Sequence, residues 1–184
     1  MSGFEKLPLQ TERLVLRPPT PADAQAFYAI FSDPQGMRYS STPPWTTMEQ
    51  AHAYVQRAID EFASGTSLRL VLQRRDDGQV IGQCVYYAIS AQNRRAELGY
   101  SMAVKAWGRG YMNEALHAFV DYGFGELDFI RIEADIDPRN VASARSLERL
   151  GFSREGLMRD RWIVAGEVSD TGFYGLLRRD WRKT

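Results

Sequence analysis

The sequence predicts one α+β domain, residues 1–184, with a mixed, mostly antiparallel sheet flanked by about four helices. The first observation is a hairpin pattern, in which apolar runs at residues 68–72 and 80–89 flank the turn residues 76–78. The second is a set of segments that place apolar residues at helical spacing between the strand-like runs. The third is that no repeat, linker or low-complexity tract divides the chain, which is long enough to bury a sizeable core.

In the first half of the chain, a short strand precedes two helices. Residues 14–16 form an apolar run that is predicted as the strand. A first helix starts at Thr20, because threonine suits the N-cap and the proline that follows suits the first turn. Thr46 or Thr47 caps a second helix, whose apolar residues recur at helical spacing until Gly65 ends it.

In the second half, strands and helices alternate before a closing hairpin. The strands are recognised by alternating character and the helices by the spacing of their apolar residues. The predicted elements are a strand at 96–104, a third helix beginning near 112, a strand at 130–137, a fourth helix at 140–150, and a hairpin at 161–164 and 172–177.

Residues 107–116 join a predicted strand to a predicted helix through Gly108 and Gly110, with Arg109 between them. The start of a helix leaves backbone N–H groups unpaired and carries a partial positive charge, so it attracts phosphate oxygens. Glycines let the backbone approach a phosphate, and Arg109 adds a charge-assisted contact. From these residues alone, a phosphate-binding loop and a plain turn are equally open, because neither the dinucleotide fingerprint nor the P-loop spacing is present.

At these residues the chain resembles the GNAT N-acetyltransferases, and within them the RimJ/RimL branch. The acetyl-CoA loop of the family reads Gln/Arg-x-x-Gly-x-Gly/Ala, and here Trp107 takes the first position, Gly110 the first glycine and Met112 the last small residue. Tryptophan in the first position is usual for that branch. Met112 departs from the family pattern, and we expect its larger side chain to tighten the space beside the pyrophosphate.

Two further segments carry the resemblance over nearly the whole chain: residues 140–156, which include Asn140, Ser143 and the run 147–152, and the opening residues 11–17. The resemblance implies a central strand pair that splays apart, acetyl-CoA as the co-substrate, and a backbone at Met102 and Val104 that pairs with the pantetheine arm. A homodimer is a further expectation. The backbone N–H groups expected to face the pyrophosphate are those of Gly108, Arg109, Gly110, Met112 and Asn113, next to Trp107.

Acetyl transfer to an amine needs a stabilised oxyanion and a neutral amine. The N–H near Met102 is the expected oxyanion donor. An amine has a pKa near ~10, so a base or a water chain must remove a proton. Glu97 is the candidate base, and partial burial would raise its pKa into a useful range. The alternative is a solvated Glu97 that pairs with Arg94 or Arg95, and Glu133 is the second candidate for binding or deprotonating the amine.

The leaving thiolate needs a hydrogen-bond donor, and the fourth helix is where the family places it. Many members carry a tyrosine there, but this chain has Leu147 at that position. Ser143 resembles the serine of the RimJ/RimL branch and is the candidate donor to the sulfur, while Asn140 is expected to orient the cofactor arm. The alternative is purely structural, because Asn140 is an excellent N-cap and Ser143 lies in the first turn.

Composition excludes several other classes. With 23 Lys+Arg against 23 Asp+Glu the chain has no net charge, which argues against a nucleic-acid partner. No apolar run is long enough to span a bilayer and the N-terminus has no apolar signal core, so no membrane partner is expected. A lone Cys84 fits a reducing compartment, and a cytoplasmic location is expected. His52 and His117 lack ligand-spaced partners, so no metal site is expected.

The sequence therefore predicts an acetyl-CoA-dependent N-acetyltransferase that moves the acetyl group to a primary amine by direct attack in a ternary complex. The acceptor is a protein N-terminal amine or a small-molecule amine, since specificity depends on loops such as residues 39–45. A non-catalytic acyl-CoA-binding or protein-interaction module on the same fold stays open because of Leu147. Candidate acceptor-pocket aromatics are Tyr39, Trp45, Tyr86, Tyr87 and Trp162.

Overall fold

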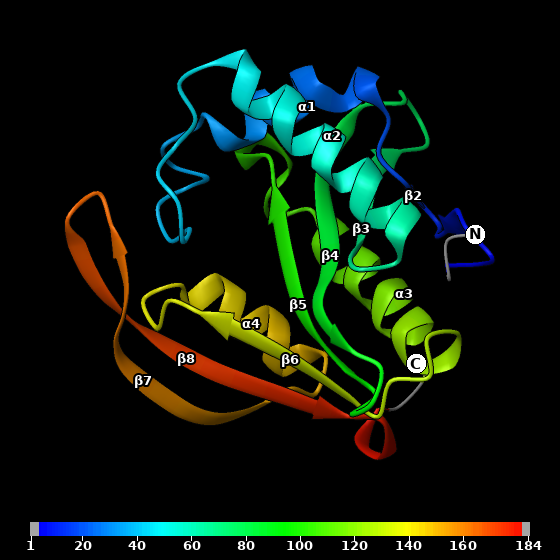
Figure 1. The fold of residues 1–184 in the computed structure, drawn as a ribbon, viewed down its shortest axis with the longest axis vertical. Helices are drawn as coiled ribbons and strands as arrows, with labels where there is room; N and C mark the ends of the chain where they lie inside the picture. The colour runs from blue at the N-terminus through cyan, green and yellow to red at the C-terminus, as the bar shows by residue number, and fades with distance from the viewer. Residues whose placement is uncertain (1–3, 182–184) are drawn as a thin grey trace.

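A computed structural model describes residues 4–181 and confirms the predicted fold class, with four α-helices and an eight-stranded mixed sheet in the order β1-β2-β3-β4-β5-β6-β8-β7 (Figure 1). All neighbouring strands are antiparallel except β5 and β6. The strands are β1 (Leu9–Gln10), β2 (Leu14–Arg17), β3 (Leu68–Arg74), β4 (Val80–Ser90), β5 (Arg95–Met102), β6 (Arg131–Ile136), β7 (Ser153–Val164) and β8 (Glu167–Leu177). The helices are α1 (Ala24–Phe31), α2 (Met48–Ser64), α3 (Tyr111–Gly125) and α4 (Val141–Arg149).

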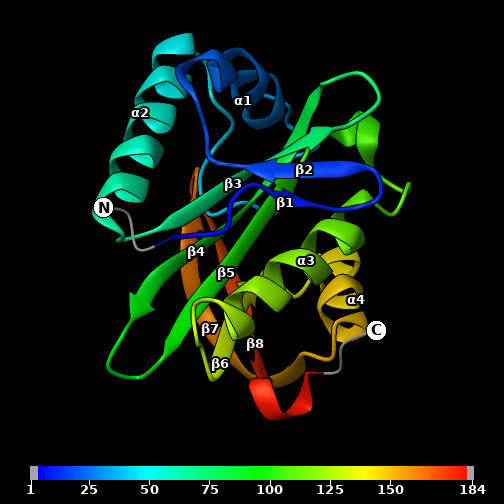
Figure 2. The same cartoon turned by 90° about the vertical axis from the view of Figure 1, so that its right-hand side faces the viewer.

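The helices cover the two faces of the sheet in pairs (Figures 1 and 2). On one face, α1 and α2 form a small core in which Phe27 and Val55 pack near Val71 of β3. On the other face, α3 and α4 pack over a larger core that includes Leu98 of β5 and Phe119 of α3. Since successive residues of a strand point to opposite faces, each strand in the middle of the sheet serves both layers.

The helix caps follow the sequence closely. Thr47 and Gln50 form a capping box at the start of α2, and Gly65 adopts the left-handed conformation (φ 73°) that ends it. Thr20 and Asp23 form a capping box as well, but the turn they cap is a 3-10 turn, Pro21–Asp23, before α1 begins. Within residues 4–181, no helix combines the length and the apolar character needed to cross a membrane.

The sheet splits at its centre, as the family resemblance implies. The parallel pairing of β5 with β6 extends only from Arg95–Arg131 to Glu97–Glu133. Beyond Glu97 the two strands diverge, and Figure 1 shows β6 and β8 leaning away from β5 toward the loop that joins α1 to α2. The last part of β5 therefore lacks a strand neighbour on this side, and strand hydrogen-bonding groups there are available to a ligand.

Two strand boundaries differ from the sequence prediction. The strand predicted at 96–104 ends at Met102, and Val104 begins a short 3-10 turn, Val104–Ala106. The closing hairpin is longer than predicted, because β7 starts at Ser153 rather than near Arg161. Almost every β7 residue is exposed, so the strand carries no alternation of apolar and polar residues from which its extent can be read.

Candidate active site

The head of α3 presents unpaired backbone N–H groups. Gly108 and Gly110 both have positive φ values, 71° and 79°, which turn the chain sharply into the helix. Gly110 is the N-cap, and no side chain caps the helix. Within the part of the chain that the structure describes, no protein acceptor takes up the amide hydrogens of residues 108–113. These amides and the positive end of the helix dipole form the anion site that the sequence predicts.

A side-chain clamp from the turn between β1 and β2 holds this loop. The Arg13 guanidinium donates to the Arg109 carbonyl at 2.9 Å and pairs with Glu114 of α3 at 2.6 Å. The Thr11 hydroxyl also donates to Glu114, at 2.6 Å. Burial opposes ionisation of Glu114, but the hydrogen bonds from Thr11 and Arg13 outweigh it and lower the pKa of this carboxyl. The family resemblance at residues 11–17 identifies this segment but does not predict that its side chains hold the glycine loop.

Trp107 links the loop back to the end of β5. Its indole Nε1 donates to the Met102 carbonyl at 2.9 Å, although the side chain is 44% exposed. The Ala103 N–H donates to Ile81 of β4, and since alternate residues of a strand direct their N–H groups to opposite sides, the Met102 N–H faces the splay. The Val104 carbonyl accepts from the Trp107 N–H at 3.0 Å, whereas the Val104 N–H has no acceptor among the described residues and can meet a ligand.

The side chains of the loop divide between solvent and core. Arg109 and Asn113 are exposed beside the uncapped amides. Met112 is 9% exposed, with its sulfur 4.0 Å from that of Cys84, so the expectation that it narrows the phosphate site is wrong. Its side chain fills the α3 core, because the helix places position 112 on the face toward the sheet. The Met112 backbone N–H stays among the uncapped amides.

Asn140 and Ser143 lie at the start of α4, on the same face of the sheet as the head of α3. The Asn140 side chain accepts the Ser143 N–H at 3.1 Å, so Asn140 is the N-cap of the helix. The Ser143 hydroxyl is not used in capping and lies 2.6 Å from the hydroxyl of Tyr100 on β5. Burial raises the pKa of Tyr100 to about 12, so its proton stays in place. Leu147 is fully buried, one turn further along the helix.

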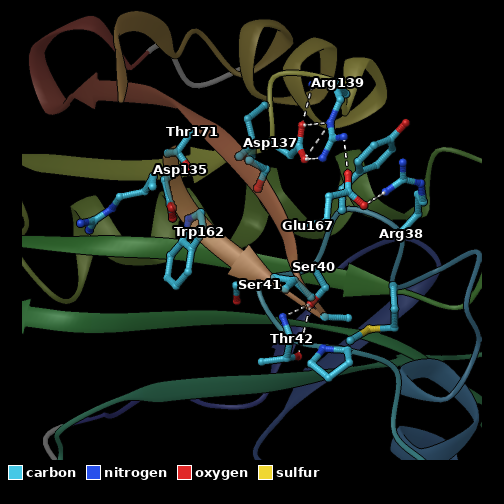
Figure 3. Close-up of a pocket in the computed structure, with 18 of the residues that line it drawn as sticks. Arg38, Ser40, Ser41, Thr42, Asp135, Asp137, Arg139, Trp162, Glu167 and Thr171 are labelled. Carbon is cyan, nitrogen blue, oxygen red and sulfur yellow. Dashed lines mark hydrogen bonds and ion pairs between the residues drawn. The ribbon is translucent and has the colours of Figure 1, made fainter. Parts of the chain in front are cut away.

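A cavity of about 530 Å³ opens on the opposite face of the sheet, between the splayed strands, the loop 34–44 and the β7–β8 hairpin (Figure 3). Of the five aromatic residues considered from sequence, Tyr39, Tyr87 and Trp162 line it. The other two pack in the cores: Tyr86 stacks on Phe119 and Trp45 lies against Phe31. The lining also includes Glu97, which places the candidate base in the cavity.

Glu97 is half-buried where the two central strands separate. The alternative of an ion pair with its arginine neighbours is wrong, because Arg94 pairs with Asp128 and Arg95 with Glu133, each at 2.6 Å. Burial, followed by the negative charge of Asp135, raises the pKa of the Glu97 carboxyl above its ordinary value. A carboxylate with a raised pKa is better suited to accept a proton from an amine.

Glu133, the second candidate, lies in a different electrostatic setting. Its carboxylate pairs with Arg95 at 2.6 Å and with Arg131 at 2.7 Å. Arg131 also pairs with Glu155, so the closed end of the strand pair holds a network of opposite charges. Both guanidinium groups occupy the Glu133 carboxylate, which does not line the cavity, and this arrangement favours Glu97 as the base.

The rim of the cavity carries a second charge network. Glu167, the first residue of β8, accepts hydrogen bonds from Arg139 at 2.5 Å and from Arg38 of the α1–α2 loop at 3.4 Å (Figure 3). Arg139 also pairs with Asp137 at 2.5 Å. These pairs connect three separate segments around the opening. Across residues 4–181, no three His, Cys, Asp or Glu side chains gather closely enough to hold a metal ion.

Comparison with known proteins agrees with this arrangement. Residues 13–153 match the family described as Acetyltransferase (GNAT) domain. The chain is 36% identical over 173 residues to the uncharacterized N-acetyltransferase p20 of Bacillus licheniformis, which covers 94% of this chain and 97% of that protein. It is 29% identical over 189 residues to the ribosomal protein uS5-alanine N-acetyltransferase of Escherichia coli, covering 98% and 95%.

A solved structure supports the same assignment. The crystal structure of a GNAT-family acetyltransferase from Bacillus anthracis superposes with a TM-score of 0.83 at 25% identity, covering 94% of this chain and 99% of that one. The family match spans more than half of the chain, and the relatives are matched over nearly their whole length. The chain therefore belongs to the GNAT family of acetyltransferases, with relatives that include a ribosomal-protein N-acetyltransferase.

Proposed function

We propose that this chain, acting as one domain over residues 1–184, transfers the acetyl group of acetyl-CoA to a primary amine by direct attack in a ternary complex. The observation that carries the proposal is the run of uncapped amides at residues 108–113, beside the open edge of β5. Such amides suit the pyrophosphate, and the open strand edge suits the pantetheine arm. A cytoplasmic homodimer stays a prediction, which light scattering and cell fractionation test.

In this proposal the two substrates approach from opposite faces of the sheet. The cofactor lies on the α3/α4 face, where the amides of Gly108, Arg109, Gly110, Met112 and Asn113 bind the pyrophosphate. Asn140 lies at the start of α4, where it would orient the pantetheine arm of the cofactor. The amine enters from the cavity that Glu97 lines. The splay of β5 from β6 connects the two sides, so the thioester and the amine meet next to Met102.

The chemical step follows from this geometry. Glu97 takes one proton from the ammonium, and the neutral nitrogen attacks the acetyl carbon to form a tetrahedral oxyanion. Collapse of this intermediate breaks the carbon–sulfur bond. The Met102 N–H stabilises the oxyanion, a kind of donor worth about 3–4 kcal/mol where measured. Of the two protons left on the nitrogen, one passes to the thiolate and the other stays on the product amide. The Ser143 hydroxyl is the adjacent donor to the sulfur when it accepts from Tyr100. No covalent enzyme intermediate is needed.

Ser143→Ala is expected to lower kcat about tenfold and to leave the affinity for acetyl-CoA unchanged, because it removes one hydrogen bond to the departing sulfur. Initial rates and calorimetric titration of acetyl-CoA measure the two quantities. The Asn140 cap is made to the Ser143 backbone and survives the substitution, so folding should be unaffected. An unchanged kcat would reduce Ser143 to a packing residue.

The alternative is a non-catalytic acyl-CoA-binding or protein-interaction module, and the buried Leu147 in the family's tyrosine position favours it. Incubation with acetyl-CoA and a panel of amines, followed by an assay for free thiol, separates the two functions. The panel includes diamines and peptides with ribosomal-protein N-terminal sequences. Thiol release that depends on one class of acceptor supports the enzyme. Tight acetyl-CoA binding without release on any acceptor supports the module.

A further inference from the structure

The face of the sheet beneath the cavity carries a row of polar side chains from four strands. Tyr87 of β4 pairs with Glu97 of β5, and paired residues share a face. Glu97 in turn pairs with Glu133 of β6, so Asp135, two residues along, points to the same side. Asp135 pairs with Phe173 of β8, which places Thr171 on this face as well. All of these residues except Glu133 line the cavity.

The charges on this face are balanced at one end and unbalanced at the other. At the closed end of the strand pair, Arg95 and Arg131 neutralise Glu133 and Glu155. Where the strands have separated, neither Glu97 nor Asp135 has an ion-pair partner among residues 4–181. The rim arginines Arg38 and Arg139 are already paired with Glu167 and Asp137, and exposed Arg161 lies over the Trp162 ring at 5.7 Å.

One of these two carboxylates accepts a hydrogen bond from a phenol. The Tyr87 hydroxyl donates to Asp135 at 3.3 Å, and the charges of Asp135 and Glu97 add to the effect of burial in raising the pKa of Tyr87, which therefore remains a donor. Gly99 makes room for this ring, since a Cβ there would come within 3.3 Å of Tyr87 Cε1. The phenol leaves most of the carboxylate oxygen capacity unused, because each carboxylate can accept several hydrogen bonds.

Thr171 supplies an independent sign of a ligand. Its side chain is 1% exposed and its hydroxyl has no hydrogen-bond partner within the described part of the chain. Figure 3 draws it on the same side of the cavity as Asp135. A buried hydroxyl without a partner is costly, and its presence in a cavity wall is explained when a bound molecule completes the hydrogen bond.

We propose that Asp135 and Thr171 bind the amino group of the acceptor as a cation, and so restrict the acceptors to amines that carry no carboxylate on the adjacent carbon. This inference rests on the proposed function, in which Glu97 takes the proton from the same group. An ammonium ion offers three donors, which match Asp135, Glu97 and the Thr171 hydroxyl. A free amino acid would bring its own carboxylate next to two uncompensated negative charges, which like-charge repulsion disfavours. N-terminal peptide amines and diamines avoid this repulsion.

The experiment compares alaninamide with alanine as acceptors, by initial rates of free-thiol release, in the wild type and in Asp135→Asn. These two probes share the amine-bearing carbon and differ in the carboxylate. Comparing their kcat/KM ratio between proteins cancels the difference in amine basicity. We expect the wild type to prefer alaninamide by on the order of 100-fold, and Asp135→Asn to reduce this preference at least tenfold, mainly by raising KM for the amide.

Two further variants separate a binding role from a structural one. Asp60→Asn removes the same charge from the exposed surface of α2. It is expected to change neither the alaninamide-to-alanine ratio of kcat/KM nor the KM for alaninamide. Thr171→Val keeps the shape of the side chain and removes its hydroxyl, and we expect a severalfold rise in KM for alaninamide with little change in kcat. A hydroxyl that only packs would give an unchanged KM and equal or greater stability.

The outcomes distinguish this inference from the proposed function. Equal use of alanine and alaninamide by the wild type, or an unchanged ratio in Asp135→Asn, overturns the inference while leaving acetyl transfer intact. If neither probe is acetylated, calorimetric titration of alaninamide into the CoA complex decides. Binding that Asp135→Asn weakens at least tenfold supports the cation site, even where the transferase activity fails. Absent binding, or binding that Asp135→Asn leaves unchanged, overturns it.

Discussion

Gly110→Asp is expected to abolish acetyl-CoA binding. The substitution places a carboxylate at the N-cap of α3, where the uncapped amides would otherwise meet the pyrophosphate. The new carboxylate competes for those N–H groups as a cap and repels the phosphate charges. Position 110 also has a φ of 79°, which strains any residue except glycine. A Cβ added there would lie 3.4 Å from the Arg13 guanidinium. Calorimetric titration with acetyl-CoA measures the loss.

Gly110→Asn is the matched control for this variant. Asparagine has nearly the same shape, tolerates the left-handed conformation better than most residues and carries no charge. Both variants share the backbone strain at position 110, so the difference between their affinities for acetyl-CoA isolates the repulsion between carboxylate and phosphate. We expect the asparagine variant to retain measurable binding and the aspartate variant to show none. Equal affinities in the two, close to that of the wild type, would contradict the assignment of residues 108–113 as the cofactor loop.

Glu97→Gln is expected to lower kcat by about 10²–10⁴-fold, the usual contribution of a general base, with acetyl-CoA affinity unchanged. The pH dependence gives the sharper test. A base must be ionised, so in the wild type kcat/KM falls as the pH drops through the pKa of Glu97, which burial and Asp135 raise. Glutamine cannot titrate, so the residual activity of the variant should lack this acid limb. Initial rates across a pH series measure both effects.

The stability of the same variant provides a control against misfolding. Because the pKa of Glu97 is raised in the folded state, ionisation of this carboxyl costs folding free energy as the pH rises through that pKa. Removing the charge should therefore leave the melting temperature equal or higher at neutral pH. Glu148→Gln, on the exposed side of α4, makes the same chemical change away from the cavity and should keep full activity. A Glu97→Gln enzyme with unaltered rate and pH profile would exclude Glu97 as the base.

The parts of the site that depend on local sequence could be predicted, and those that depend on distant pairing could not. The glycines at 108 and 110 have a local signal, because a sharp turn into a helix requires positive φ. Asn140 likewise carries its capping role in its own residue type and position. The expectation for the Met112 side chain is wrong, because the loop pattern does not indicate which face of the following helix packs on the sheet.

Asp135 and Thr171 were not predicted, because their association with Tyr87 depends on the register of four strands. Asp135 and Thr171 are 36 residues apart by their numbers and meet only through the pairing of β6 with β8. Tyr100 escaped for a similar reason, since its hydroxyl partner lies on α4. The signal that was present is the alternation along β6, in which Glu133 and Asp135 share a face between apolar neighbours. Two acids on one face of an inner strand mark a site to examine.

The short stretch of pairing between β5 and β6 has a thermodynamic consequence. Hydrogen bonds join the β1–β5 part of the sheet to the β6–β8 part through three residue pairs along this seam. A coenzyme lying in the seam would act as the missing strand and bind only the folded chain, so occupancy is linked to stability. We expect saturating coenzyme to raise the melting temperature and to slow amide hydrogen exchange most strongly in the unpaired ends of β5 and β6.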